Sequence, residues 1–214
     1  MITAEDVDGN LLAAIRAITP LEGKQILDLG TGTGRLPLLL AGAASQFVGF
    51  DLHLAMLRQN RVQRQIAGGC WSLVQGDMRR LPLLSNWTDI TMAGWAIGHM
   101  RSWFALAWRD QIGQALIEMQ RVTRPGGFLI VLETLGTGSL EPAPPVQRLA
   151  EYYAWLEGQW GFSRRVIPTD YQFASVEEAI SLTEFFFGPE LSARIRAYGW
   201  SRLPEWTGVW FRQV

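Results

Sequence analysis

Apolar and polar positions along the chain follow two different periods. Five short runs are almost continuously apolar, as strands buried on both faces of a sheet are. They cover 25–29, 46–51, 71–75, 90–94 and 128–134. Between these runs, apolar residues recur at steps of three and four, which predicts amphipathic helices. The clearest helix is expected over 103–122, and the alternation as a whole predicts an α/β fold with a largely parallel sheet.

The chain on both sides of this alternating part carries further elements. A helix that ends before Pro20 is expected at 11–18, and a first crossover helix at 35–43. Beyond residue 134 the pattern predicts three helices and two strands. The helices are expected at 146–160, 175–187 and 189–198, and the strands at 164–171 and 207–213. No repeat or linker interrupts the sequence, so we expect one domain over 1–214 that begins with a helical cap at 1–22.

Composition narrows the class of partner. The 214 residues carry 19 Lys and Arg against 20 Asp and Glu, which gives a formal net charge of −1. This balance lacks the positive excess of a strong nucleic-acid binder, so we expect a small-molecule partner rather than DNA or RNA. Cys70 is the single cysteine, the acidic start lacks a signal-peptide pattern, and no apolar run reaches the ~18 residues that cross a bilayer. These features favour a cytoplasmic protein without a membrane partner.

A glycine-rich turn follows the first predicted strand. Gly30, Gly32 and Gly34 stand at alternate positions, where the missing side chains let the backbone turn sharply and approach a ligand. Asp51 ends the second predicted strand, and its carboxylate can accept two hydrogen bonds from a ribose diol. Together these features predict a nucleotide-like cofactor. The dinucleotide spacing G-x-G-x-x-G is excluded, because it requires a glycine where this chain has Arg35.

Motif-like stretches continue in order along the chain. They are Ile26-Leu-Asp-Leu-Gly-Thr-Gly-Thr-Gly34, Val48-Gly-Phe-Asp51, Gly76-Asp77-Met78 followed by Leu81-Pro82, Asp89-Ile-Thr-Met-Ala-Gly94, and Arg124-Pro-Gly-Gly-Phe-Leu-Ile-Val131. This series resembles the class I S-adenosylmethionine (SAM)-dependent methyltransferases over 25–134. The resemblance implies a Rossmann-like sheet of seven mostly parallel strands with helices on both faces. It also implies that the antiparallel last strand lies between the fifth and sixth strands.

The resemblance implies SAM as the cofactor and assigns a role to each motif. The residues implied for the methionine part are Asp28, Gly30, Thr31, Gly32 and Gly34, with Asp28 orienting the loop. Asp51 would hold the ribose hydroxyls. The alternatives are a tight turn without ligand for the glycines and a helix N-cap for Asp51. Asp51 can bind the ribose and cap the helix at the same time.

The remaining motif residues are assigned to the adenine and the amino group. Asp77 would accept from the adenine amino group, and the Met78 backbone amide would face a ring nitrogen. Leu52 would pack against the adenine together with Leu81. Ala93 and Gly94 would offer carbonyls to the ammonium of the cofactor. A turn role for Asp77 and a core role for the two leucines remain open alternatives.

Methyl transfer from a sulfonium requires mainly that nucleophile, methyl and sulfur are aligned. His99 is the candidate catalytic residue, because it follows the fourth predicted strand by five residues and could deprotonate an O- or N-nucleophile. The alternative is a histidine that satisfies nearby backbone groups. No Cys and His cluster or H-x-x-x-H pair is present, so we expect no metal.

Aromatic side chains gather in the segment after the fifth strand. In the resembled family an insertion here often walls the acceptor site, and we expect that insertion over 136–170. Tyr152, Trp155 and Trp160 are therefore candidate acceptor contacts, while a plain core role is the alternative.

The sequence thus predicts a SAM-dependent methyltransferase that acts on a small-molecule O- or N-nucleophile. Two other classes stay open: an RNA- or protein-modifying methyltransferase, and a non-catalytic protein that binds SAM to regulate a partner. The identity of the acceptor, the atom methylated and the oligomeric state do not follow from the sequence.

Overall fold

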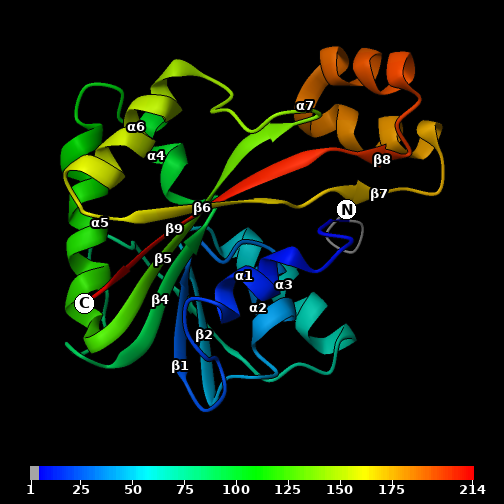
Figure 1. Cartoon of the computed structure of the whole chain (residues 1–214). Helices are drawn as coiled ribbons and strands as arrows, with labels where there is room; N and C mark the ends of the chain where they lie inside the picture. The colour runs from blue at the N-terminus through cyan, green and yellow to red at the C-terminus, as the bar shows by residue number, and fades with distance from the viewer. Residues whose placement is uncertain (1–4) are drawn as a thin grey trace.

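The computed structural model of the protein describes residues 5–214, and within them one large sheet forms the centre of the molecule (Figure 1). Its seven strands lie in the order β3-β2-β1-β4-β5-β9-β6. They are β1 Gln25–Leu29, β2 Gln46–Asp51, β3 Ser72–Gln75, β4 Thr88–Gly94, β5 Thr123–Thr137, β6 Ser163–Pro168 and β9 Glu205–Gln213. The strands β3, β2, β1, β4 and β5 pair in parallel, whereas β9 runs antiparallel to both β5 and β6. The prediction of a mostly parallel sheet whose last strand is antiparallel and lies between the fifth and sixth is confirmed.

Helices cover both faces of this sheet (Figure 1). On one side lie α1 Asn10–Arg16, α2 Arg35–Leu40 and α3 Leu54–Ile66, and on the other α4 Met100–Trp103, α5 Trp108–Val122 and α6 Gln147–Gly158. A hydrophobic core lies on each face of the sheet, and alternate side chains of β1 belong to one or the other. Ile26 packs with residues of α1 and α2, while Leu27 and Leu29 pack with residues of α5 and α6. A strand buried on both faces reads as a continuous apolar run, which is the pattern the sequence showed.

A smaller unit leaves the main sheet between β6 and β9. It consists of the two-stranded sheet of β7 Tyr171–Gln172 and β8 Arg202–Leu203, packed against α7 Val176–Tyr198. Gly188 interrupts α7 with non-helical dihedrals (φ 79°, ψ 179°), so α7 consists of two helices on either side of a kink, as expected at 175–187 and 189–198. The segment that departs from the sheet is therefore 171–203. Residues 136–170, where the insertion was expected, contain α6 and β6, which complete the main layers.

Two elements near the cavities differ from the sequence-based expectation. The helix expected over 103–122 is broken, because Phe104 has non-helical dihedrals (φ −124°, ψ 52°) after α4 and α5 begins only at Trp108. The strand β5 begins at Thr123 instead of 128, since Thr123 pairs with Thr88 of β4 and the chain end bonds to the residues that follow. Gly126 donates to the Val214 carbonyl at 2.8 Å, and Val214 donates to Gly127 at 2.9 Å.

The first segment of the chain packs on the sheet through α1, whose Leu11 and Ile15 are buried in the core shared with α2. Residues 1–4 of the cap expected at 1–22 lie outside the described residues. Among residues 5–214, no helix is both long enough and apolar enough to cross a membrane.

Candidate functional site

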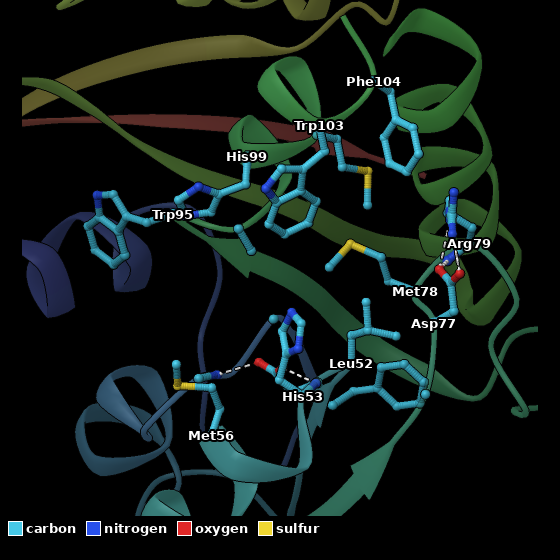
Figure 2. Close-up of a pocket in the computed structure, with 17 residues that line it drawn as sticks. Leu52, His53, Met56, Asp77, Met78, Arg79, Trp95, His99, Trp103 and Phe104 are labelled. Atoms are coloured by element: carbon cyan, nitrogen blue, oxygen red, sulfur yellow. Dashed lines mark hydrogen bonds and ion pairs between the residues drawn. The ribbon is translucent and has the colours of Figure 1, made fainter. Parts of the chain in front are cut away.

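A cavity opens at the carboxyl ends of the central parallel strands (Figure 2). The chain crosses from β1 to β2 in one direction along the sheet and from β4 to β5 in the other, which creates the crevice where open α/β sheets bind ligands. Its volume is about 380 Å³. Four segments line it: the glycine turn after β1, the end of β2, the turn after β3 and the stretch that follows β4. Residues that follow four separate strands therefore meet at one place, and three of the sequence motifs contribute to it.

The glycine turn is shaped by backbone conformations that side chains disfavour. Gly30, Gly32 and Gly34 all have positive φ, at 72°, 52° and 107°. A Cβ at Gly30 would stand 2.3 Å from the Cβ of Ala96, so only glycine fits against the segment after β4. At Gly32 the closest atom to a Cβ would be 3.8 Å away. Gly30 and Gly32 line the cavity, whereas Gly34 caps α2 beneath it.

The backbone N–H groups of the turn are bonded within the protein. Gly30 and Thr31 both donate to the carbonyl of Phe50, at 2.7 and 3.1 Å. Gly32 donates to Asp51 Oδ2 at 2.9 Å, and the other oxygen of that carboxylate accepts from the His53 backbone at 2.8 Å. Asp51 thus ties the turn after β1 to the start of α3 while still lining the cavity. The two roles considered for Asp51 coexist, because each carboxylate oxygen has a further lone pair for a hydroxyl.

Asp28 lies behind the glycine turn and does not line the cavity. Its carboxyl group is buried, and neither oxygen has a hydrogen-bond partner among residues 5–214. Burial raises the pKa of Asp28 to about 7; the nearby Thr31 hydroxyl lowers this pKa and the Asp51 carboxylate raises it. A buried polar group without a partner is rare in folded proteins, and it is the feature by which the turn departs most from an ordinary strand-to-helix connection.

The opposite end of the cavity holds an ion pair. Both oxygens of Asp77 accept from Arg79 Nε, at 2.9 and 3.0 Å, and Oδ1 also accepts from the Arg79 backbone at 2.9 Å (Figure 2). The Arg79 side chain lowers the pKa of Asp77 and keeps it ionised. Arg79 in turn lies over the ring of Phe104, 5.1 Å from its centroid, and bonds to Gln111 on α5. The turn role of Asp77 is present, and its carboxylate also faces the cavity.

Other residues predicted for the cofactor divide between the cavity wall and the core. Leu52 and Met78 line the cavity, and Leu52 is half exposed. Leu81 is buried in the core instead. Ala93 and Gly94 end β4 just behind the wall, and a Cβ at Gly94 would meet Leu36 at 2.8 Å rather than open space.

His99 and Trp95 form the side of the cavity that follows β4. His99 lies in a short 3-10 helix, Ile97–His99, and its ring stacks on Trp103 at 5.6 Å between centroids (Figure 2). Trp95 has φ 50°, a left-handed conformation that costs a bulky residue of order 1–3 kcal/mol. The backbone N–H of Trp95 donates to the Leu132 carbonyl at 2.7 Å, and this bond holds the Trp95 backbone in place. Trp95 was not predicted from the sequence as a site residue, although its position directly after β4 indicates the ligand-binding edge of the sheet.

A second cavity lies on the other side of these two residues. Its volume is about 510 Å³, and both His99 and Trp95 line it as well as the first cavity. Three carboxyl groups reach it from distant parts of the chain: Glu5, Glu133 and Glu205. None of these three carboxyl groups was predicted from the sequence as part of a site. Glu133 could have been found, since it is the one charged residue within the apolar run that ends β5.

The aromatic residues proposed as acceptor contacts lie elsewhere. Tyr152 is fully buried in the core, and Trp155 and Trp160 pack against the same core. Their rings form a cluster with Trp108, in which centroids lie 5.2 to 6.4 Å apart. None of the three lines either cavity. The structure therefore favours the core role for these rings: Tyr152 on α6 is buried, and Trp155 on α6 and Trp160 just beyond it pack against the core.

Among residues 5–214, no group of three His, Cys, Asp or Glu side chains is arranged as a metal site would be. The groups suited to a ligand are instead the carboxylates of Asp51 and Asp77, the glycine turn, and the rings around His99.

Comparison with known proteins gives a consistent family. A family model described as a methyltransferase domain matches residues 27–131. A malonyl-[acyl-carrier protein] O-methyltransferase of Methylococcus capsulatus is 33% identical over 150 residues, which cover 69% of this chain and 50% of that protein. A ubiquinone/menaquinone biosynthesis C-methyltransferase of Syntrophotalea carbinolica is 35% identical over 57% of this chain and 48% of its own. The chain spans about half the length of these two curated relatives.

Solved structures are similar over nearly the whole chain. A SAM-dependent methyltransferase from Aquifex aeolicus has a TM-score of 0.60 at 16% identity, covering 95% of this chain and 89% of that one. The YcgJ protein from Bacillus subtilis has a TM-score of 0.59 at 14% identity, covering 95% and 97%. At these identities the likeness establishes the fold.

Proposed function

We propose that this chain, which belongs to the class I SAM-dependent methyltransferase superfamily, transfers a methyl group from SAM to a small-molecule O- or N-nucleophile. The observation that supports this most directly is the pair of adjoining cavities. One lies at the carboxyl ends of β1, β2 and β4, and the other shares its wall residues Trp95 and His99. A reaction between two bound molecules needs two such spaces in contact.

The residues around the first cavity fit SAM chemically. Asp51 has lone pairs left for ribose hydroxyls, and Leu52 and Met78 offer apolar surface to a base. A ligand can approach Gly32 closely, because the space at its Cβ position is open. Behind the turn, the carboxyl group of Asp28 has no hydrogen-bond partner among residues 5–214. SAM supplies a methyl group on a sulfonium, which a nucleophile attacks in line with the departing sulfur.

The protein's own contribution is then alignment and exclusion of water. Holding two reactants in line is worth about 7–11 kcal/mol of activation free energy in well-oriented systems. Trp95 and His99 line both cavities; the Trp95 backbone is held by its bond to Leu132, and the His99 ring stacks on Trp103. His99 is the residue we propose as a base for the acceptor, because it alone among the titratable groups lines both cavities.

An open second cavity also favours an enzyme over a regulatory SAM-binding protein, which would not need one. The two relatives are named for different reactions, at oxygen and at carbon, so their names do not select the acceptor. We further propose that 1–214 act as one methyltransferase domain, and that the protein works in the cytoplasm on a small molecule; the near-neutral charge and the single cysteine support this.

Calorimetry with S-adenosylhomocysteine, the demethylated product of SAM, tests the cofactor assignment. We expect the wild-type protein to bind it and Asp51→Asn to bind it about tenfold to a hundredfold less tightly, because the loss of a charged acceptor weakens each hydrogen bond by ~1.5–3 kcal/mol. Asp110→Asn, at the exposed start of α5, is a matched control that should leave the affinity unchanged. Absence of binding by the wild-type protein would refute the proposed function.

A further inference from the structure

The second cavity is acidic in a way that its neighbour is not. Glu5, Glu133 and Glu205 line it from the N-terminal segment, β5 and β9. Two guanidinium groups also line it, those of Arg35 and Arg148. Arg148 is exposed on α6, so Arg35 is the one buried cation.

The guanidinium group of Arg35 already has an anionic partner. Arg35 forms an ion pair with Glu5 at 2.5 Å, and its guanidinium lies over the ring of Trp95, 3.4 Å from the centroid. Glu133 and Glu205 form no ion pair with any of the residues 5–214. The cavity therefore presents two buried carboxyl groups in excess of its buried positive charge.

These two carboxyl groups have acceptor capacity to spare. Glu133 accepts from the Gly98 backbone at 2.8 Å, and Glu205 Oε1 accepts from the Thr134 hydroxyl at 3.2 Å. Glu205 Oε2 has no hydrogen-bond partner among the described residues, although the side chain is buried and lines the cavity. A buried carboxyl oxygen without a partner is costly unless a ligand supplies the donor.

The remaining wall combines the polar residues Ser102, Thr134 and Thr137 with apolar and aromatic ones. Leu149, Phe186 and Phe187 line the cavity together with the rings of Trp95 and Tyr171. Phe186 and Phe187 stand next to the kink of α7 at Gly188 and are exposed, so they form the part of the wall that faces solvent. A ligand for this space has an apolar body and a group that donates hydrogen bonds to carboxylates.

We propose that the second cavity binds the methyl acceptor as an amine, protonated in solution and attached to an apolar or aromatic body, whose nitrogen donates a hydrogen bond to the carboxyl group of Glu133 or of Glu205. This inference rests on the proposed methyl transfer and narrows its O- or N-nucleophile to nitrogen. An anionic acceptor is disfavoured, because it would enter among three carboxyl groups where the only buried guanidinium is paired with one of them.

The same groups provide a place for the proton that a nucleophilic nitrogen must lose. When a carboxylate of Glu133 or Glu205 takes one N–H proton, it becomes a neutral carboxylic acid and the nitrogen keeps the electron pair of that bond. Burial raises the pKa of Glu133 to about 8 and that of Glu205 to about 7, so both groups exchange protons near neutral pH. The groups that act on them are the Gly98 N–H and the Tyr152 hydroxyl at Glu133, and Thr134, Thr137, Glu5 and Arg35 at Glu205.

Three probes of similar shape and different charge test the proposal. Protein saturated with S-adenosylhomocysteine is titrated at pH 7 with 2-phenylethylamine, 2-phenylethanol and 3-phenylpropionate. We expect the amine to bind most tightly and to release protons, because a cation lowers the pKa of both carboxyl groups. The release is measured by repeating the calorimetry in buffers of different ionisation enthalpy. An anion would instead cause proton uptake.

Variants locate the binding. Glu205→Gln should weaken amine binding about tenfold, the loss expected for one charge-assisted hydrogen bond, and should leave 2-phenylethanol nearly unaffected. Glu190→Gln, at an exposed position of α7 outside both cavities, is the matched control and should bind all three probes like the wild type. Binding of S-adenosylhomocysteine by each variant shows that it is folded.

The outcomes separate this inference from the function it rests on. If S-adenosylhomocysteine binds but the amine binds no more tightly than the alcohol or the carboxylate, the amine proposal is wrong and methyl transfer to another acceptor stands. Unchanged amine affinity in Glu205→Gln would have the same consequence. If S-adenosylhomocysteine itself does not bind, the proposed function fails first.

Discussion

The two cavities are built in different ways although they share a wall. The first is formed by short segments near the ends of strands, and it includes residues of the local motifs 26–34, 48–51 and 76–78. The second is formed by single side chains from places far apart in the sequence: Glu5, Arg35, Glu133 and Glu205. A space shaped by local turns can be recognised from the sequence, whereas one shaped by distant side chains requires the fold.

Charge differs between the cavities as well. In the first, Asp77 is paired with Arg79 and Asp51 accepts two backbone hydrogen bonds, so its carboxylates that reach the ligand space are satisfied. In the second, Glu133 and Glu205 have no cationic partner among residues 5–214, and burial raises their pKa values. The difference indicates that the first cavity is already organised for its ligand and that the second depends on its ligand to complete it.

The largest expected effect comes from filling the glycine turn. Gly30→Ala would place a Cβ 2.3 Å from Ala96 at a positive φ, so we expect a loss of about 2–4 kcal/mol in the free energy of unfolding. Affinity for S-adenosylhomocysteine should fall about a hundredfold, because the backbone must move away from Ala96 and narrow the first cavity. Chemical denaturation and calorimetry measure the two effects.

Gly42→Ala is the control for this substitution, since a Cβ there would meet no atom within 4 Å and the backbone does not have a positive φ. If Gly30→Ala were as stable and bound as tightly as Gly42→Ala, the turn would not be the rigid floor of the first cavity.

The next largest effect is expected on the pH dependence of the free energy of unfolding, and it tests the second cavity. The pKa of Glu133 is raised from 4.5 to about 8 in the folded state, so the folded protein binds this proton more tightly than the unfolded chain. The associated stability is fully present below pH 4.5 and is lost as the pH rises through 8. Glu133→Gln cannot ionise, and we expect it to reduce the fall in unfolding free energy between pH 5 and pH 8 by on the order of 2 kcal/mol.

Urea denaturation of both proteins at these two pH values measures the difference. Asp28 and Glu205 also have pKa values raised to about 7, so part of the fall should remain in Glu133→Gln. If the unfolding free energy fell equally in the variant and the wild type between pH 5 and pH 8, Glu133 would not be the buried acid that the second cavity requires.

The smallest effect is expected at the wall shared by the cavities. If His99 accepts a proton from the acceptor, His99→Gln should lower turnover at least about tenfold, while affinity for S-adenosylhomocysteine stays within about twofold of the wild type. Turnover is measured with radiolabelled SAM and an acceptor identified by binding. An unchanged turnover would leave His99 as a wall residue and make the glutamates of the second cavity the remaining proton acceptors.

The sequence anticipated the main sheet well and the region beyond it less well. The strands 25–29 and 46–51 match β1 and β2, because buried parallel strands have a distinctive continuous apolar pattern. The helix expected over 103–122 is broken at Phe104, which has non-helical dihedrals and whose ring lies 5.1 Å from the Arg79 guanidinium, a residue distant in the sequence. The start of β5 was misplaced because its pairing with Thr88, and the bonds of Gly126 and Gly127 to Val214, join residues far apart in the chain.

The sequence by itself determined the α/β class, the order of the elements and the glycine turn with Asp51, because periodicity and backbone freedom act over a few neighbouring residues. Only the tertiary structure decided that Tyr152 is buried in the core with Trp155 and Trp160 packed against it, and that Glu133 and Glu205 line one cavity with Trp95 and His99. Those residues are separated by up to 110 positions in the sequence. Their proximity results from strand pairing and helix packing across the whole sheet, which no local pattern records.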